Sequence, residues 1–148
     1  MPRVKIIHGP LLDRLGERET DYYGTEPLEE INASLVAMGE AVGVEVDCFQ
    51  SDIEGEIVTE IANCRGKCNF LIVNPAAYSH TSVAIYDAIV FCQVPTVEVH
   101  LSNLASREPF RRQSTISSVV VGRLEGLGPD GYRLAMRFCL ERLTANGI

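Results

Sequence analysis

The sequence has no apolar stretch as long as the roughly 18 residues that a membrane span requires. Near the amino terminus, Lys5 interrupts the first apolar run and Pro10 ends it, which is not the pattern of a signal peptide. We therefore expect a cytoplasmic protein that does not act in a membrane.

The chain also lacks the paired cysteines of a disulfide framework. Its five cysteines are Cys48, Cys64, Cys68, Cys92 and Cys139. An odd number of cysteines, scattered through apolar segments, favours buried free thiols in a reducing compartment. No second cysteine or histidine pair accompanies Cys64 and Cys68 at ligand spacing, and tetrahedral zinc needs four ligands, so we expect no metal site.

Positive charge is scarce as well. Thirteen lysines and arginines stand against twenty acidic residues, which gives a formal net charge of -7. This balance disfavours nucleic acid as a partner of the whole surface, because a polyanion is repelled by it. A small anion in a local basic pocket remains compatible with the charge.

What the chain does contain is enough apolar material for one core. Of its 148 residues, 46% are hydrophobic and 22% are charged, which predicts a single domain spanning residues 1–148. Apolar runs predict strands at 3–8, 44–49, 69–74, 95–100 and 116–122. Amphipathic stretches predict helices at 26–43, after Ser51 or Asp52, from Thr81 or Ser82 to Cys92, and at 130–146.

This alternation of strands and helices predicts the fold class. Parallel strands need crossover connections, and short connections place the helices on both faces of the sheet. We expect an α/β protein, a flavodoxin-like three-layer sandwich with a five-stranded parallel sheet. The helix at 26–43 should bury Leu28, Ile31, Leu35, Met38 and Val42, and the strand at 69–74 is apolar enough to be covered on both faces.

Ligands of such sheets bind beyond the carboxyl ends of the strands. The segments that follow the first, third and fourth strands hold all three histidines, His8, His80 and His100, and five of the eleven arginines. The first of these segments lacks the glycine run and the lysine of a phosphate loop. About fourteen residues without regular structure indicate a functional lid, although a solvated surface loop is the alternative.

The end of the fourth strand carries a candidate acid–base pair. Glu98 and His100 are two residues apart, so their side chains point to the same face, and the carboxylate can fix the tautomer of the imidazole. The amides of Leu101 and Ser102 with the Ser102 hydroxyl form a plausible nest for a carboxylate or phosphate. A purely structural histidine is the alternative.

Cations and polar groups surround this pair in the sequence. Arg107, Arg111 and Arg112 follow it, and Asn74 and His80 follow the neighbouring strand. In the first loop, Tyr22 and Tyr23 stand near Arg14 and Arg18; a tyrosine becomes a base near neutral pH only if positive charge, here from Arg18 and Arg107, stabilises the phenolate. These groups favour removal of a proton next to a carbonyl followed by loss of a hydroxyl, with no metal and no redox cofactor.

At this point the sequence resembles the type II 3-dehydroquinate dehydratase family. The matching stretches, in chain order, are "LGERETDYYG" (15–24), "FQSDIEGEIV" (49–58), "NPAAYSHTSVA" (74–84), "DAI" (87–89), "PTVEVHLSN" (95–103), "REPFRRQS" (107–114) and "GLGPDGYRLAM" (126–136). They follow the family order over nearly the whole chain. The resemblance implies a flavodoxin-like hydro-lyase that converts 3-dehydroquinate to 3-dehydroshikimate through an enolate, in the shikimate pathway of aromatic amino acid biosynthesis or in quinate catabolism.

The resemblance also implies roles for the residues near the reacting atoms. Tyr23 matches the general base and Arg18 the arginine that activates it. His100 matches the general acid that protonates the departing hydroxyl, Glu98 its orienting partner, and Asn74 an amide that binds near them.

Further matches concern substrate binding and assembly. The implied substrate-binding residues are His80, Asp87, Leu101, Ser102, Arg107 and Arg111. Leu101 and Ser102 match the residues that hold the substrate carboxylate, His80 and Arg111 those that bind ring hydroxyls, and Arg107 a second arginine near the base. Asp87 matches an acid that reaches the site from a neighbouring subunit, and the family assembles as trimers gathered into dodecamers.

The chain departs from the family at the start of the first loop. The family has Asn-Gly-Pro-Asn-Leu-Asn, whereas this chain has "HGPLLD", so His8, Leu11 and Asp13 each replace an asparagine. Leu11 replaces the asparagine that would order the water next to the enolate. His8 could take over that contact, or the pocket could serve a related cyclic hydroxy-keto acid; a non-catalytic binding homologue is a third reading. Ala76, Tyr86 and Ala105 also replace a usual glycine, arginine and histidine.

Overall fold

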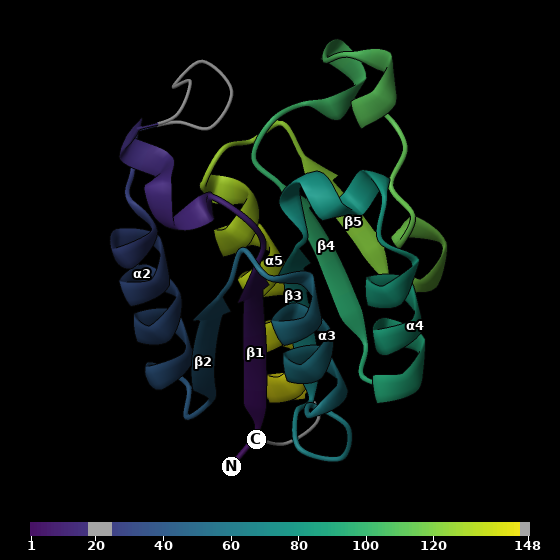
Figure 1. Cartoon of the computed structure of the whole chain (residues 1–148). Helices are drawn as coiled ribbons and strands as arrows, with labels where there is room; N and C mark the ends of the chain where they lie inside the picture. Colours follow the sequence, from purple (N-terminus) through teal and green to yellow (C-terminus); the bar gives the residue numbers. More distant parts are fainter. Residues whose placement is uncertain (18–24, 146–148) are drawn as a thin grey trace.

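A computed structural model describes residues 1–17 and 25–145. Its centre is one parallel five-stranded sheet with the strand order β2-β1-β3-β4-β5 (Figure 1). The strands are β1 (Arg3–His8), β2 (Glu45–Gln50), β3 (Phe70–Asn74), β4 (Thr96–His100) and β5 (Gly122–Glu125). This order is that of a flavodoxin-like sheet, and the predicted fold class is therefore confirmed.

Helices cover both faces of the sheet (Figure 1). They are α2 (Leu28–Glu40), α3 (Glu54–Ala62), α4 (Val83–Cys92) and α5 (Asp130–Ala145). Helices α2 and α5 enclose one half of the core, and α3 and α4 enclose the other. Strand β3 contributes Ile72 to the first half and Leu71 and Val73 to the second, which confirms that this strand is covered on both sides.

Helix α2 is shorter than predicted. Leu28, Ile31 and Leu35 are buried and Met38 packs against them, but the helix ends at Glu40. Val42 lies in the following turn and is 42% exposed, so its predicted place in the core is wrong. The turn is completed by Gly43, whose φ of 74° is open to glycine at little cost, and Val44 then enters the core instead.

The fifth strand lies later than the predicted range 116–122. Ile116 is fully buried in the α3–α4 half of the core, and Val119 and Val120 pack against that half. Ser117–Val119 form the 3-10 turn η5, and β5 pairs with β4 only from Gly122 onward. Most of the apolar run at 116–122 therefore packs against the α3–α4 half of the core and does not pair with β4.

The two predicted helix starts had different outcomes. Ser82 is the N-cap of α4, where its hydroxyl accepts a hydrogen bond from the Ile85 amide at 2.9 Å. Neither Ser51 nor Asp52 caps α3, because the cap position is Ile53, which is 59% exposed and outside the core. The Ser51 hydroxyl instead accepts the Ile53 amide proton at 2.9 Å in the turn before the helix.

The first loop is partly regular, contrary to the expectation of a long irregular segment. Leu12–Glu17 form the 3-10 element η1, which buries Leu12 and Leu15 in the α2–α5 half of the core. At its root the Gly9 amide donates to the Asn74 carbonyl at 2.7 Å, and a Cβ on Gly9 would lie 2.5 Å from the Pro75 carbonyl oxygen. Arg18, Tyr22 and Tyr23 lie outside the described residues.

All five cysteines are free thiols, as predicted. Cys64, Cys92 and Cys139 are buried, whereas Cys48 and Cys68 are only half-buried. Within the described part of the chain, no helix has both the length and the apolar character needed to cross a membrane.

Candidate active site

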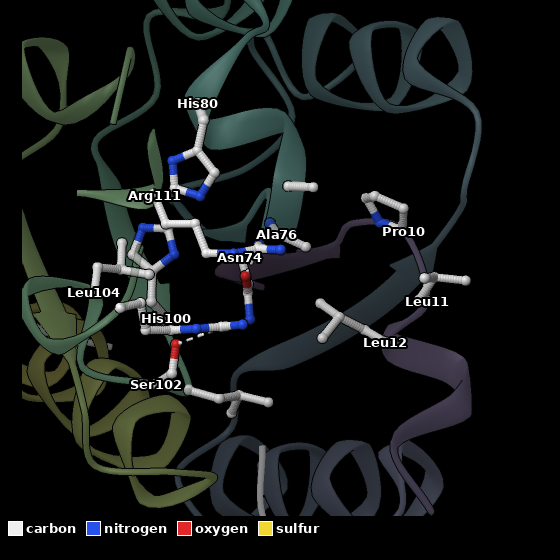
Figure 2. A pocket seen from close by; sticks show the side chains of 13 residues that line it. Pro10, Leu11, Leu12, Asn74, Ala76, His80, His100, Ser102, Leu104 and Arg111 are labelled. Atoms are coloured by element: carbon white, nitrogen blue, oxygen red, sulfur yellow. Dashed lines mark hydrogen bonds between the residues drawn. The ribbon is translucent and has the colours of Figure 1, made fainter. Parts of the chain in front are cut away.

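A pocket opens at the carboxyl ends of β1, β3 and β4, as the sequence predicted for a parallel sheet. The predicted site residues that line it are Asn74, His80, His100, Leu101, Ser102, Arg107 and Arg111. Figure 2 shows both histidines and Arg111 on one side of the pocket, with Pro10, Leu11 and Leu12 across from them. The polar wall thus comes from strand ends and the apolar rim from the first loop.

Glu98 and His100 form a buried pair at the end of β4. Glu98 is completely buried and His100 is 3% exposed. One carboxylate oxygen of Glu98 contacts His100 Nε2, and the other accepts a hydrogen bond from the Ser117 hydroxyl at 2.6 Å. Because a carboxylate only accepts, His100 Nε2 carries the proton of this bond and Nδ1 is left for proton exchange with a bound molecule.

The protonation state of Glu98 follows from its partners. Burial alone would raise the pKa of this carboxyl group, but hydrogen bonds and charge from His100, with hydrogen bonds from Ser114 and Ser117, hold its pKa below the usual value. Glu98 is therefore an anion at neutral pH, and it stabilises positive charge on His100.

Asn74 presents a fixed amide at the end of β3. Its side-chain oxygen accepts from the Ala76 amide at 3.0 Å, and its side-chain nitrogen donates to the Tyr132 hydroxyl at 2.9 Å. Since the Ala76 amide can only donate, the oxygen and nitrogen of the Asn74 side chain cannot exchange places.

Basic and hydroxyl groups line the region next to β4. The Arg107 guanidinium lies 3.4 Å from the Ser102 hydroxyl, and only 7% of the Arg107 side chain is exposed. Arg111 is held by Glu108 through a 2.8 Å ion pair. The pocket therefore has the charge and the hydroxyl group to bind a small carboxylate.

His80 faces the same pocket in its neutral form. Its Nδ1 donates to the Gln113 carbonyl at 2.8 Å, which leaves Nε2 as an acceptor for a ligand hydroxyl. Burial lowers the pKa of His80, and the positive charges of His100, Arg111 and Arg107 lower it further, against the opposing bond to Gln113.

One predicted site residue lies away from this pocket, and two others lie outside the described residues. Asp87 is exposed on α4 and does not line it. Arg18 and Tyr23 belong to the part of the chain that the structure does not describe, so their predicted roles stay predictions.

The proposed role of His8 as a ligand of the catalytic water is wrong. His8 is completely buried and does not line the pocket. Its Nδ1 lies 2.9 Å from the Tyr132 hydroxyl and its Nε2 lies 2.8 Å from the Asn32 side-chain oxygen, so both ring nitrogens are occupied. Asp13, another departure from the family, is exposed and likewise outside the pocket lining.

Sequence reasoning missed Tyr132 and Asn32. Tyr132 is completely buried behind Asn74, although nothing in the spacing of the sequence connects them. Asn32 had a signal, because it follows Leu28 by four residues and precedes Leu35 by three, on the buried stripe of α2. A polar residue on such a stripe needs a buried partner.

Leu11 and Ala76 have left-handed backbone conformations, with φ of 66° and 51°. Such values are uncommon for residues with a side chain, except that asparagine tolerates them and glycine adopts them freely. These are the residue types that the family has at the two positions. Leu11 is also 46% exposed at the rim, so its side chain is not a buried part of the pocket.

The fold and the pocket together define an α/β protein with a carboxylate–histidine pair at a pocket lined by Arg107 and Arg111. A family model described as "Dehydroquinase class II" matches residues 2–140 of this chain. The chain therefore belongs to the class II dehydroquinase family.

Curated relatives and solved structures agree with this family. The chain is 46% identical to a 3-dehydroquinate dehydratase of Campylobacter hominis over 139 residues, which are 94% of this chain and 90% of the relative. It is 47% identical to a 3-dehydroquinate dehydratase of Laribacter hongkongensis over 147 residues, 99% and 95% of the two chains. The type II dehydroquinase of Propionibacterium acnes superimposes with a TM-score of 0.89 at 38% identity, covering 93% of this chain and 95% of that one.

Proposed function

We propose that this protein is a type II 3-dehydroquinate dehydratase, which removes water from 3-dehydroquinate to give 3-dehydroshikimate. Family membership and curated relatives of that name support the activity. The single observation that carries it is the buried Glu98–His100 pair, which opens onto a pocket lined by Arg107 and Arg111. The relatives do not favour the alternative of a different cyclic hydroxy-keto acid.

His100 is the general acid of the proposed reaction. Its protonated imidazole gives a proton to the departing hydroxyl group, which leaves as water. Glu98 keeps Nε2 protonated and balances the positive charge, so that proton transfer occurs at Nδ1. Ser117 holds the far oxygen of Glu98 and fixes the carboxylate in place.

The substrate carboxylate binds beside this acid. The backbone amides of Leu101 and Ser102 and the Ser102 hydroxyl hold its oxygens, and Arg107 supplies positive charge next to Ser102. His80 accepts a hydrogen bond from a ring hydroxyl, and Arg111 donates to another. These contacts orient the ring so that the leaving hydroxyl faces His100.

Tyr23 is the base of the proposed reaction. Its phenolate, stabilised by Arg18 and Arg107, takes the proton from the carbon next to the ketone, and the electron pair forms an enolate. Collapse of the enolate expels the hydroxyl that His100 protonates. Net loss of one proton and one hydroxide from the substrate gives water, and transfer of the proton from Tyr23 back to His100 through solvent restores the enzyme.

We also propose a trimer-based homo-oligomer, consistent with a dodecamer. Helix α4 is apolar on its outer face as well as its inner one, because Val83, Val90 and Phe91 are 65%, 52% and 52% exposed. Asp87 lies on the same helix, exposed and away from the pocket of its own chain. A neighbouring subunit on this face would cover the apolar residues and receive Asp87.

The substrate places the reaction in the shikimate pathway or in quinate catabolism, and we propose a cytoplasmic location. The family's chemistry supports the pathway, and the free thiols support the location.

The experiment that tests the function is an ultraviolet assay for enone formation from 3-dehydroquinate. Tyr23→Phe and His100→Gln should each lower turnover by more than about a hundredfold, since acid–base groups typically contribute 10²–10⁴. Glutamine is chosen because its amide can still donate to buried Glu98, and thermal unfolding should confirm that the fold is intact. The matched control is Tyr22→Phe, which should keep wild-type turnover. An inactive wild-type protein, or a Tyr23→Phe variant with half of the wild-type rate, would refute the assignment.

A further inference from the structure

A buried hydrogen-bond chain lies directly behind Asn74. It joins residues of four different elements, namely Asn32 of α2, His8 of β1, Tyr132 of α5 and Asn74 of β3. The three links measure 2.8, 2.9 and 2.9 Å in that order. His8 and Tyr132 are completely buried, so solvent does not compete for these bonds.

The donor and acceptor of each hydrogen bond in this series can be assigned by starting at Asn74, which lines the pocket. The Ala76 amide can only donate, so the Asn74 side-chain oxygen faces it and the side-chain nitrogen faces Tyr132. The Tyr132 oxygen therefore accepts from Asn74, and its own proton must go to another acceptor.

That acceptor is His8 Nδ1. Since Nδ1 accepts, the proton of the neutral imidazole is on Nε2, where it donates to the Asn32 side-chain oxygen. No step in the chain pairs two donors or two acceptors. Burial agrees with the neutral ring, because it lowers the pKa of His8 to about 4 against the opposing bond to Asn32.

The opposite tautomer of His8 would break this order. A proton on Nδ1 would point at the Tyr132 oxygen, which already receives one from Asn74, and the Tyr132 proton would have no acceptor among these groups. Exchanging the oxygen and nitrogen of the Asn74 side chain would give the Tyr132 proton an acceptor. It would also place the Asn74 NH₂ group opposite the Ala76 N–H, so that two donors would face each other.

We propose that His8 is a positioning residue of the active site, which acts through Tyr132 to hold the Asn74 amide with a free N–H toward the substrate. An amide nitrogen has two hydrogens, and Tyr132 uses one of them. The second is available to a bound molecule in the pocket that Asn74 lines, where it could stabilise negative charge on an oxygen. This inference rests on the proposed dehydration only for the role of that N–H, not for the hydrogen-bond chain itself.

Two conservative variants separate this role from simple filling of space. The side-chain oxygen of asparagine lies about where the imidazole has Nδ1, whereas glutamine reaches to the position of Nε2. His8→Asn therefore keeps an acceptor for Tyr132, and His8→Gln keeps only the contact with Asn32. Tyr132→Phe removes the hydroxyl with almost no change in shape and interrupts the same chain at its next link.

The first readout is steady-state kinetics on 3-dehydroquinate. We expect His8→Gln and Tyr132→Phe to lower kcat roughly tenfold with a smaller change in KM, as loss of one well-placed hydrogen bond in the transition state does. His8→Asn should recover most of the rate that His8→Gln loses. Equal rates for the two His8 variants would overturn the proposal.

The second readout needs no substrate. The side-chain NH₂ resonances of Asn74 and the ring nitrogens of His8 can be followed by ¹⁵N NMR, which should show an Nε2–H tautomer in the wild type. The Asn74 resonances should move in His8→Gln and Tyr132→Phe and stay near the wild-type position in His8→Asn. An Nδ1–H tautomer, or Asn74 resonances that do not respond to His8→Gln, would overturn the inference even if the wild type proved inactive on 3-dehydroquinate.

Discussion

Leu11, at the rim of the pocket, is unfavourable for both the backbone conformation and the proposed chemistry. Its φ of 66° costs a branched side chain roughly 1–2 kcal/mol of conformational energy, and its side chain has no donor to offer an enolate water. The Leu11 amide donates to Asp52 at 2.9 Å, which helps to hold this conformation.

We therefore expect Leu11→Asn to raise both stability and turnover. Asparagine tolerates the left-handed conformation, so the free energy of unfolding should rise by about 0.5–1 kcal/mol. Because the side chain is 46% exposed, the new amide is not buried without a partner. Turnover of 3-dehydroquinate should increase, by up to about a hundredfold if a full oxyanion donor is restored. Denaturant unfolding and steady-state rates measure the two effects.

Leu11→Gly is the matched control for this substitution. Glycine relieves the backbone without adding an amide side chain, so it should not increase turnover. A rate for Leu11→Asn that is no higher than the wild-type rate would mean that the missing donor does not limit this enzyme.

His8 predicts how stability depends on pH. Burial lowers its pKa from 6.5 to about 4, although the Asn32 bond opposes the change. In the unfolded chain His8 therefore takes up a proton near pH 6.5, whereas in the folded protein it does so only near pH 4. The contribution of a neutral His8 to the free energy of unfolding is therefore complete above pH 6.5. Between pH 6.5 and pH 4 it decreases on acidification by up to about 1.4 kcal/mol per pH unit.

Urea unfolding between pH 7 and pH 4 can measure this slope, with His8→Asn as the comparison. The variant has no titrating group at this position, so its unfolding free energy should decrease less over the same range. Parallel curves for the two proteins would contradict a buried neutral His8. Glu98 and His80, whose pKa values are also lowered, are present in both proteins, so the difference between the two curves reports His8.

The distance between partners along the chain explains which of these residues the sequence could identify. Glu98 and His100 are two residues apart on one strand, so the alternation of side chains alone brings them together. His8 meets partners that are 24 and 124 residues away, which only the packing of α2 and α5 against β1 can decide. The resemblance to the family gave no help, because histidine is not the family residue there.

At the scale of elements, helix α4 offers a direct test of a cap that the sequence predicted. Ser82 is buried and accepts the Ile85 amide proton, one of the donors that the first turn leaves without a partner. Ser82→Ala should lower the free energy of unfolding by about 1 kcal/mol, within the range for lost N-caps.

The control for Ser82→Ala is Ser51→Ala in the turn before α3. Ser51 also accepts an amide proton but is not at the cap position of its helix, so we expect a smaller loss of stability. A loss for Ser82→Ala no greater than that for Ser51→Ala would contradict the cap. Thermal unfolding of both proteins is sufficient.

The strand that the sequence misplaced shows the limit of apolar patterns. A run such as the one at 116–122 predicts burial, but burial does not say whether the partner is a strand or a helix surface. Ile116 packs in the half of the core enclosed by α3 and α4, and the pairing of β5 with β4 begins at Gly122, opposite Val97. By contrast, β1, β3 and β4 were predicted to within one residue at each end, because they lie in the interior of the sheet and are buried along nearly their whole length.

At the scale of the whole molecule, the outer face of α4 offers a test of the proposed assembly. Phe91→Glu places a charge on the exposed apolar face, where the residue is 52% exposed and its loss costs the monomer core little. Light scattering should show trimers or dodecamers for the wild type and smaller species for the variant. Turnover should fall with assembly if Asp87 acts across the boundary.

Val42→Glu is the matched control for assembly. Val42 is 42% exposed in the turn after α2, away from α4, and its substitution should leave the oligomer intact. A wild-type protein that is a fully active monomer would exclude the assembly proposal.

The contact between Gly9 and the end of β3 has a practical consequence for exchanging loops between relatives. No side chain fits at Gly9, and the η1 residues Leu12 and Leu15 are buried in the core, so this stretch is packed as part of the sheet and its core. A chimera that joins a foreign loop directly after β1 would replace part of the scaffold together with the loop. A recombination point after Leu15 would instead exchange the segment containing Arg18 and Tyr23 and leave the buried residues before it unchanged. We therefore expect this boundary to be the better crossover point for chimeric enzymes.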